Sequence, residues 1–312
     1  MERIRWTDPC PYGNKPVVFA IGFFDGIHLG HRRLIREARR LADAQGADVA
    51  VLSFDPHPSV LLNPQDPVPM IYTPEEREWI LFETGMVDHF VLMRFEESLA
   101  RMEPEDFVGK VLFTGWNCKG VVVGEDFRFG NGNSGSAAQL AELCRTRGAA
   151  AWLIPDVTED GCKVSASLIR ELLIAGNIEE ANRLLGRPYL LMGTVGHGRG
   201  LGHRRLIPTV NLPYIQGKIV PKKGVYATRT FWDGEAHDGV SNIGVNPTVS
   251  EGTDAHCESF LFDLNEDLYG VQMRTELYHF IRPERKFADV EALRTQQRSD
   301  VLKARKYLQS SG

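Results

Sequence analysis

The sequence predicts two domains: an α/β domain built on a parallel sheet, followed by a small antiparallel β-barrel that ends in a helix. The chain has 312 residues, whereas a single domain typically has about 150. In the first half, short apolar segments alternate with helical patterns, as in an α/β fold. After Gly-Arg-Pro at 186–188, strand-like segments follow one another with turn residues between them. We therefore expect the two domains at residues 1–186 and 187–312.

Five segments of the first half are predicted to be strands, and most are continuously apolar, which is typical of a parallel sheet covered on both faces. They are residues 17–21, 48–54, 87–93, 120–123 and 149–154. Helices are expected between them, at 32–44, 74–84, 104–113 and 137–147. The second of these helices has a clear start, with Thr73 as N-cap, Pro74 at the first position and Glu76 closing a capping box. Two short helices, at 167–175 and 178–185, are expected to complete the first domain.

The second half has the pattern of a compact antiparallel barrel. Strands are expected at residues 189–195, 209–213, 224–232, 258–264 and 271–280. The tail at 287–308 returns to helical spacing, with Phe287, Val290 and Leu293 on one face.

Charge and cysteine content exclude several classes of protein. The 36 basic and 41 acidic side chains give a net charge of -5, which argues against bulk binding of nucleic acid. No apolar run approaches the roughly 20 residues of a membrane span, and the first 13 residues lack the apolar stretch of a signal peptide. The five cysteines are scattered and form no C-x-x-C, so we expect neither a disulfide framework nor a zinc site. A reducing cytoplasm is the simplest compartment for such a chain.

The turn after the first strand carries two histidines. Residues 22–31 read G-F-F-D-G-I-H-L-G-H and lead into a helix. Glycines allow close approach of a phosphate, and a helix N-terminus offers free N–H groups and a partial positive charge. His28 and His31 are three residues apart, so both can point at one phosphate and stabilise charge on it during in-line displacement. The alternative is that both histidines only cap the helix.

Three further polar clusters stand at corresponding places in the pattern. They read S-F-D-P-H-P at 53–58, G-E-D-F-R-F-G at 124–130 and V-S-A-S-L-I-R at 164–170. Open α/β sheets bind ligands at the carboxyl ends of their strands. Four clusters of this kind favour a binding site over helix capping alone.

These motifs resemble the nucleotidyltransferases with an H-x-G-H signature, and specifically the N-terminal half of bacterial FAD synthetases. The resemblance implies a Rossmann-like domain that adenylylates FMN, with His28, His31 and Arg170 at the reacting phosphates. By the same resemblance, nucleotide binding falls to Gly22, Phe23, Asp25, Gly26, Ser165 and Ser167, and flavin binding to His57, Asp126, Phe127 and Arg128. The sequence S-A-S at 165–167 departs from the usual S-S-T and lacks one hydroxyl.

The glycine-rich segment at 130–135 offers a competing interpretation. It reads G-N-G-N-S-G, and Asp156 follows at the end of a strand, as in a dinucleotide-binding fingerprint. That fingerprint normally occupies the first βα turn, where this chain carries its histidines. We interpret the segment as a glycine-rich loop and rank a nicotinamide-dependent oxidoreductase well below nucleotidyl transfer.

A second glycine-rich loop lies in the barrel half. Gly198, Gly200 and Gly202 occupy alternate positions, so the loop could fold over phosphates. Thr209 and Asn211 follow at i, i+2 and leave the same face of a strand, where their oxygens could bind a Mg²⁺ held mainly by nucleotide phosphates. The alternative is a glycine-rich hairpin with strand threonines.

Glu258 is a candidate general base. On its predicted strand it shares a face with Phe260, Phe262 and Leu264. A carboxylate at the mouth of an apolar face is partly desolvated, which suits it to accept a proton. The alternative is an exposed glutamate at a strand end.

The barrel motifs resemble riboflavin kinase, the C-terminal half of the same bifunctional enzymes. In order they are P-T-V-N at 208–211, G-V-Y-A at 224–227, N-I-G-V-N-P-T at 242–248, E-S-F-L-F-D at 258–263 and D-L-Y-G at 267–270. The resemblance implies that Thr209 and Asn211 bind Mg²⁺ and ATP, that Asn242 belongs to the nucleotide site, and that Glu258 deprotonates the ribityl 5′-hydroxyl of riboflavin. Arg205-Leu206 stands where the family usually has Leu-Gly, which affects the nucleotide loop.

The sequence therefore predicts an enzyme that phosphorylates riboflavin to FMN with Mg-ATP and adenylylates FMN to FAD with release of pyrophosphate. Its expected partners are these small molecules, with neither nucleic acid nor membrane. One alternative is a monofunctional FMN adenylyltransferase whose barrel binds flavin without phosphorylating it. Another is a flavin carrier without turnover, which would not need the two histidines.

Overall fold

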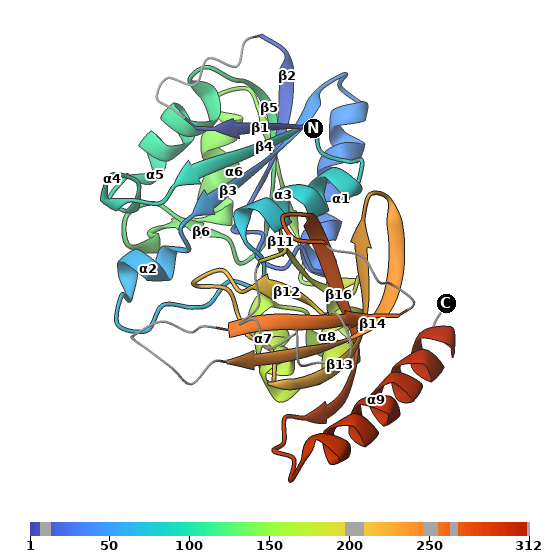
Figure 1. Cartoon of the computed structure of the whole chain (residues 1–312). Helices are drawn as coiled ribbons and strands as arrows, with labels where there is room; N and C mark the ends of the chain where they lie inside the picture. The colour runs from blue at the N-terminus through green and yellow to red at the C-terminus, as the bar shows by residue number, and fades with distance from the viewer. Residues whose placement is uncertain (7–13, 197–208, 246–254, 263–267, 311–312) are drawn as a thin grey trace. The chain divides into compact units, whose positions relative to one another are not determined.

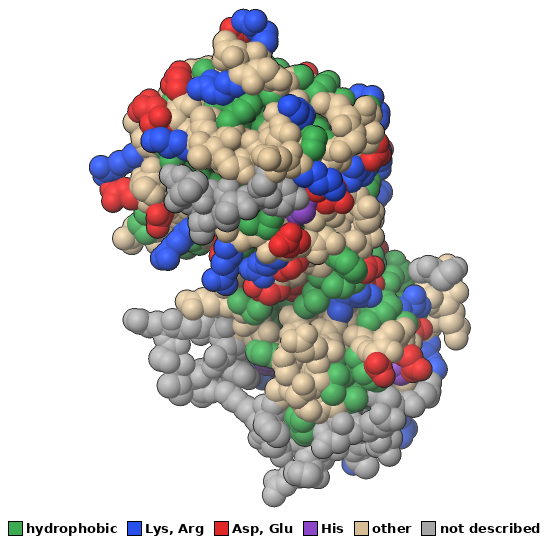
Figure 2. All heavy atoms as spheres, turned by 90° about the horizontal axis from the view of Figure 1, so that it is seen from above, with side chains coloured by type: hydrophobic (Ala, Val, Ile, Leu, Met, Phe, Trp, Pro, Cys, Tyr) green, Lys and Arg blue, Asp and Glu red, His purple; other side chains and the backbone are tan. Residues whose placement is uncertain are grey.

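The computed structural model describes residues 1–6, 14–196, 209–245, 255–262 and 268–310, and the chain divides into two compact units, Met1–Ser165 and Ala166–Gly312. The predicted α/β sheet and antiparallel barrel are both confirmed (Figure 1). Over the face in Figure 2, lysine and arginine side chains are interspersed with aspartate and glutamate. Among the described residues, no helix has the length and apolar character needed to cross a bilayer.

The first unit is built on a six-stranded parallel sheet in the order β1-β4-β3-β2-β5-β8. The strands are β1 (Glu2–Arg5), β2 (Pro16–Ile21), β3 (Asp48–Asp55), β4 (His89–Arg94), β5 (Asn117–Gly124) and β8 (Ala150–Ile154). The strand order runs in opposite directions on the two sides of β2, so the switch point of the sheet lies between β2 and β5. Ligands bind at such a point, outside the carboxyl ends of the strands.

Helices cover both faces of this sheet (Figure 1). One face packs on α6 (Ala137–Arg145) and on the π-helix η1 (Phe107–Phe113), whose Val111 and Leu112 are fully buried. Helix α1 (Leu29–Asp43) packs on β2, β3 and β5 through Ile35 and Ala38. The remaining short elements are α2 (Pro58–Leu62), α3 (Pro74–Glu83), α4 (Glu97–Ala100), α5 (Pro104–Asp106), β6 (Arg128–Phe129), η2 (Asn131–Asn133), β7 (Gly135–Ser136), β9 (Thr158–Glu159) and β10 (Cys162–Lys163).

Two differences from the prediction in this unit concern the edge of the sheet and the helix expected at 104–113. Strand β1 was not predicted, because its four residues E-R-I-R carry little apolar signal and it lies at the sheet edge, parallel to β4. The helix expected at 104–113 is α-helical only at Pro104–Asp106 and continues as the π-helix Phe107–Phe113. The capping box of Thr73 and Glu76 at the start of α3 is confirmed.

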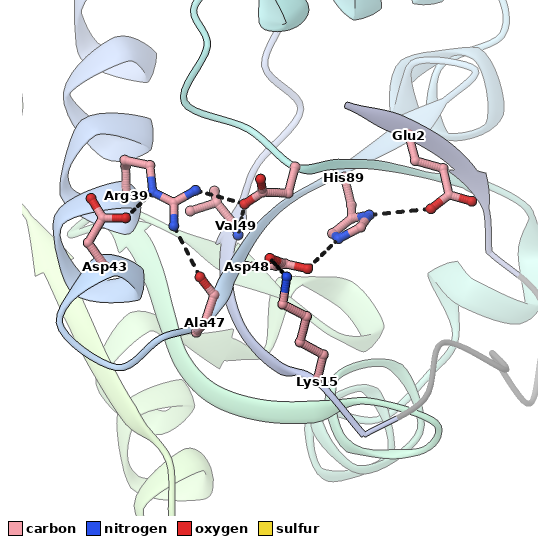
Figure 3. A network of polar contacts seen from close by, with 9 residues as sticks. Glu2, Lys15, Arg39, Asp43, Ala47, Asp48, Val49 and His89 are labelled. Carbon is pink, nitrogen blue, oxygen red and sulfur yellow. Dashed lines mark hydrogen bonds and ion pairs between the residues drawn. The ribbon is translucent and has the colours of Figure 1, made fainter.

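The amino ends of the strands are joined by charged side chains (Figure 3). Asp48 of β3 lies between Lys15, at 2.5 Å from Nζ to Oδ1, and His89 of β4, at 2.9 Å from Nε2 to Oδ2. The other ring nitrogen of His89 lies 3.7 Å from the Glu2 carboxylate on β1. Strands β3, β4 and β1 are therefore linked at their amino ends, at the opposite end of the sheet from the predicted site.

The second unit is a nearly closed antiparallel barrel in the order β11-β16-β13-β14-β15-β12. Its strands are β11 (Tyr189–Thr194), β12 (Val210–Pro213), β13 (Gly224–Trp232), β14 (Glu235–Val245), β15 (Ala255–Leu261) and β16 (Gln272–Pro283). A bridge between Gly196 and Asn211 brings the two end strands together. Helix α9 (Val290–Ser310) packs on β13, β14 and β16.

Strand β14 was not predicted, because its sequence E-A-H-D-G-V-S-N-I-G-V lacks a clear alternation. The signal that could have found it is the turn before it. Asp233 and Gly234 both have positive φ, 50° and 81°, as an Asp-Gly hairpin turn requires.

Helices α7 (Ala166–Ala175) and α8 (Ile178–Leu185) belong to the second compact unit, although the prediction placed them in the first domain. Helix α8 packs on β11 and β16. The Asn182 side chain accepts a hydrogen bond from Tyr189 N at 2.7 Å and donates one to Leu277 O at 2.8 Å. These contacts explain why α8 belongs to the second compact unit, and the domain boundary at 186–187 stays a prediction.

Candidate active sites

The turn after β2 has a strained backbone. Phe24 and Ile27 have positive φ, 53° and 43°, as does Gly26 at 82°. Such a conformation is costly for a β-branched residue, so the surrounding structure must enforce it. Gly26, which was expected to allow close approach of a phosphate, therefore lies in a turn whose backbone is held by its neighbours.

Asp25 is one of the groups that fix this turn. Its buried carboxylate accepts hydrogen bonds from Ile71 N at 2.9 Å and from Tyr72 N at 3.1 Å, just before α3. The side chain predicted to bind nucleotide thus contacts backbone in the structure. A direct contact between Asp25 and nucleotide stays a prediction.

His28 and His31 lie together, as the spacing predicts. Their rings stack with centroids 3.8 Å apart. His28 is buried and is the N-cap of α1, where its Nδ1 accepts from His31 N at 3.4 Å. His28 therefore caps the helix, and because its Nδ1 is the acceptor, the ring carries a proton on Nε2.

His31 is held in its neutral form. Burial lowers its pKa well below the usual range, and the neighbouring charges of His28 and Arg77 act in the same direction. Its Nδ1 is buried and makes no hydrogen bond to any described residue. The ring thus keeps an unpartnered polar atom beside the switch point of the sheet.

Arg77 of α3 was missed by the sequence analysis. It is fully buried and donates to Phe23 O and to Ser53 Oγ, both at 2.8 Å, and to Phe54 O at 3.3 Å. Its guanidinium also lies 4.9 Å from the centroid of the Phe23 ring. Arg77 thus ties together the carboxyl ends of β2 and β3. The signal available in the sequence is weak, because an arginine in a helix usually faces solvent.

The residues predicted to bind flavin lie beyond the carboxyl ends of β3 and β5. His57 caps the five-residue helix α2, with Nδ1 accepting from Ser59 N at 3.1 Å, and its ring meets Phe23 edge-on at 4.3 Å. Asp126 is exposed and pairs with Lys163 at 2.6 Å, which also reaches Asp156 at 2.8 Å. These two carboxylates raise the pKa of Lys163, so it stays charged.

The hairpin that follows settles the structure of the glycine-rich segment. Phe127 stacks on Phe129, and Arg128 is exposed on β6, which pairs with β7. Gly130 and Gly132 lie between the two strands of this hairpin, and Gly135 lies on β7 opposite Phe129, where a Cβ would be 2.7 Å from the Phe129 ring. This turn follows β5, whereas a dinucleotide-binding fingerprint would follow the first strand of the fold, so the segment is a glycine-rich turn as predicted.

The third polar cluster spans the division between the units. Ser165 is the last residue of the first unit, and Ser167 and Arg170 lie on α7 in the second. Their grouping with the histidine turn into one phosphate site stays a prediction.

In the barrel, the strand register places several predicted residues in one row. Glu258 of β15 lies directly opposite Asn211 of β12 on one side and Asn242 of β14 on the other. Asn242 in turn lies opposite Val225 of β13, which is opposite Arg282 of β16. Directly opposed residues share one face of a sheet. We call these five residues the Glu258 row.

Glu258 is half-buried and accepts a hydrogen bond from Thr209 Oγ1 at 2.9 Å. Phe260 shares its face of β15, as predicted. Strand β15 ends at Leu261, so the prediction that Phe262 lies on this strand is wrong. Leu264, which was also expected there, lies outside the described residues. Asn242 donates from Nδ2 to Glu284 Oε1 at 3.0 Å.

A cavity of about 1050 Å³ lies between this face of the barrel and α9. Thr209, Asn242 and Glu258 supply part of its polar wall. Its apolar wall is formed by Val225, Val240, Phe260, Phe287, Val290, Leu293 and Val301. The glycines at 198, 200 and 202, and Arg205-Leu206, lie outside the described residues.

Comparison with known proteins identifies the family. A family model described as FAD synthetase matches residues 11–168, and one described as riboflavin kinase matches residues 185–308. The bifunctional riboflavin kinase/FMN adenylyltransferase of Listeria monocytogenes is 35% identical over 304 residues, covering 97% of this chain and 94% of that protein. The chain belongs to the family of bifunctional riboflavin kinase/FMN adenylyltransferases.

Other relatives agree with this assignment. The family members of Bacillus subtilis and Escherichia coli K12 are 35% and 33% identical, and each match covers 93% of this chain and 92% of the relative. A solved structure from Streptococcus pneumoniae, titled a macrolide-efflux protein, matches with a TM-score of 0.87 at 29% identity and covers 97% of this chain and 98% of that one. The chain carries both enzyme domains of its family, which supports the bifunctional prediction over the monofunctional alternative.

Proposed function

We propose that this bifunctional enzyme transfers the adenylyl group at the histidine turn of the first unit and phosphorylates riboflavin at the Glu258 row of the second. In both reactions an oxygen nucleophile attacks a phosphorus of ATP. The riboflavin 5′-hydroxyl attacks the γ-phosphate and releases ADP. A phosphate oxygen of the FMN so formed then attacks the α-phosphate of a second ATP and releases pyrophosphate.

The geometry of the histidine turn supports adenylyl transfer. His28 and His31 stack at the N-terminus of α1, beside the switch point of the sheet. The N–H groups of the two imidazoles can donate to the non-bridging oxygens of the α-phosphate as charge builds there. Because the nucleophile is already a phosphate anion, the site needs donors more than it needs a base.

The Glu258 row supports the kinase reaction. A hydroxyl nucleophile must lose a proton, and Glu258 offers a carboxylate at the edge of a largely apolar cavity. The apolar wall suits the flat flavin ring, and the polar end suits the ribityl chain. Asn242 lies opposite Glu258 in the strand register, so a nucleotide bound by Asn242 would lie close to the proposed base.

Thr209 and Asn211 fit a Mg²⁺ that arrives with ATP. A hydroxyl and an amide oxygen are hard ligands, and two protein ligands leave most of the coordination to phosphates and water. Thr209 donates its proton to Glu258, so its oxygen lone pairs remain available. Such an ion neutralises charge on the phosphates.

We place these reactions in a reducing compartment, the cytoplasm. Cys118, Cys144, Cys162 and Cys257 are all free thiols. Burial raises the pKa of the Cys257 thiol to about 11, so it stays protonated and unreactive.

The observation that carries the kinase assignment is the placement of Glu258 between Asn211 and Asn242, with Thr209 bonded to it. Riboflavin and ATP given to the wild-type chain should yield FMN and then FAD, separated by chromatography. Glu258→Gln removes the proton acceptor with little change of shape, and should reduce FMN formation by roughly 10²–10⁴. FMN adenylylation by the same variant should stay at the wild-type rate.

Glu235→Gln is the matched control, because Glu235 is an exposed glutamate at the start of β14, outside the cavity. It should leave both reactions unchanged. Wild-type FMN formation by Glu258→Gln would assign the base to another residue. A wild-type chain that adenylylates FMN but never makes it from riboflavin would favour the monofunctional alternative.

A further inference from the structure

Helix α9 is held on the barrel in different ways along its length. Its C-terminal half packs through Ala304 and Leu308, both buried, against Ala227 of β13. Its N-terminal half borders the cavity instead. Val290, at its first turn, is 64% exposed. The cavity-lining half therefore has little apolar burial to hold it in place.

An ion pair lies at the junction of the two halves. Asp300 is 2% exposed, and its carboxylate lies 3.0 and 3.1 Å from Arg282 Nε and 2.8 Å from Nη2. A guanidinium and a carboxylate in this paired geometry fix both distance and orientation. One turn earlier on α9, Gln296 donates to Asp300 Oδ1 at 2.6 Å, and Arg285 donates to Gln296. These contacts fasten the cavity-lining half of α9 to the end of β16 and the segment after it.

Arg282 is also part of the Glu258 row. It lies opposite Val225, whose other neighbour, Asn242, lies opposite Glu258. Four residues of the row, on the adjacent strands β15, β14, β13 and β16, thus connect the proposed base with the ion pair that holds α9. The Glu258 row therefore forms part of the barrel wall of the cavity and also holds the opposite wall, α9, through Arg282.

We propose that the Arg282–Asp300 ion pair is a positioning pair of the kinase site, which sets α9 at the distance that holds the flavin ring of riboflavin against the barrel. This rests on the proposed function of the cavity as the riboflavin site. The pair acts through α9 and not on the reacting atoms. Breaking it should loosen the wall for the ring while Thr209 and Glu258 keep their places on the barrel, so that binding suffers more than the chemical step.

The test compares steady-state kinetics of FMN formation in full-length variants. Asp300→Asn removes the charge that holds Arg282 and should raise the KM for riboflavin by about tenfold while kcat stays within about threefold of wild type. The charge-swapped double variant, Arg282→Asp with Asp300→Arg, should recover most of the lost affinity. Glu291→Gln is the matched control, since Glu291 lies on the same helix in an exposed pair with Arg294, at 3.8 Å.

Adenylylation of supplied FMN reports on the other unit and should be unchanged in every variant. An unchanged KM for riboflavin in folded Asp300→Asn, or a loss confined to kcat, would overturn the proposal. If circular dichroism shows that Asp300→Asn does not fold, the double variant decides: a KM near wild type supports a positioning pair, and a raised KM in a folded chain refutes it. A wild-type chain that forms no FMN would instead reject the proposed function, and this proposal with it.

Discussion

At the residue scale, Asp25 and Arg77 hold the histidine turn in place by contacting backbone. The Asp25 carboxylate accepts from two N–H groups before α3, and the Arg77 guanidinium donates to carbonyls of Phe23 and Phe54. The turn between them includes a β-branched residue, Ile27, at positive φ. Such a conformation persists only where neighbours enforce it. These two side chains supply part of that enforcement, and they set the position of both histidines.

His31 makes stability of the first unit depend on pH. Burial lowers its folded-state pKa well below the value of about 6.5 expected in the unfolded chain. Between these two pKa values the unfolded chain binds more protons, so stability from this group is present above about pH 6.5 and is lost as pH falls through the folded pKa. Replacing His31 by Gln should remove this contribution.

Thermal unfolding of the wild type and of His31→Gln, each measured from pH 7.5 to pH 5, checks this prediction. As the pH is lowered from 7.5 to 5, the Tm of the wild type should fall by more than the Tm of His31→Gln. Parallel curves for the two proteins would show that His31 titrates normally in the folded chain.

At the scale of elements, β13 and β16 approach each other closely at the end of the Glu258 row. Gly224 has a φ of 152°, and a Cβ there would lie 2.3 Å from the Arg282 carbonyl oxygen. A side chain at this position must therefore displace backbone. The close approach of β13 and β16 at this point therefore requires glycine at position 224.

Gly224→Ala should destabilise the barrel by roughly 1–3 kcal/mol, the usual cost of forcing extra atoms into a packed site. It should also lower FMN formation more than adenylylation, because the displaced backbone belongs to Arg282. Gly193→Ala is the matched control, since a Cβ there would meet Leu212 at an ordinary 3.7 Å. Urea denaturation and the two activity assays measure both effects, and equal stability of the two variants would contradict the prediction.

At the scale of the whole molecule, each reaction is assigned to side chains of one unit, apart from the predicted contributions of Ser167 and Arg170. His31→Ala should lose adenylyl transfer by ~10²–10³, the scale of one lost transition-state donor, and should keep kinase activity. Glu258→Gln has the opposite defect. A mixture of the two variants should therefore convert riboflavin to FAD, because FMN released by one chain can be adenylylated by the other.

Chromatography of the mixture, with each variant alone as control, measures this complementation. Neither variant alone should form much FAD from riboflavin. If the mixture also fails while each variant keeps its remaining activity, the FMN made in one chain does not reach the site of another.

Local patterns in the sequence were enough to predict the class of fold and the candidate reactions. Hydrophobic periodicity predicted the central strands of the sheet, and turn and cap signals located α3 and the histidine turn, because these signals lie among residues adjacent in the chain. The motifs around His28, Thr209 and Glu258 predicted both reactions before any contact was known. Their local character is why they could be recognised.

Contacts between residues far apart in the chain could be found from the three-dimensional structure alone. The pairing of Asn211 and Asn242 with Glu258 depends on strand register, which no single segment specifies. The burial of Arg77 depends on carbonyl groups of the turn after β2 and of β3, and the placement of α8 depends on its contacts with β11 and β16. Strands β1 and β14 have weak apolar patterns, so their conformation depends on pairing, of β1 with β4 and of β14 with β13 and β15. In each case the deciding energy is that of packing and hydrogen bonding between segments far apart in the chain, which local preference does not encode.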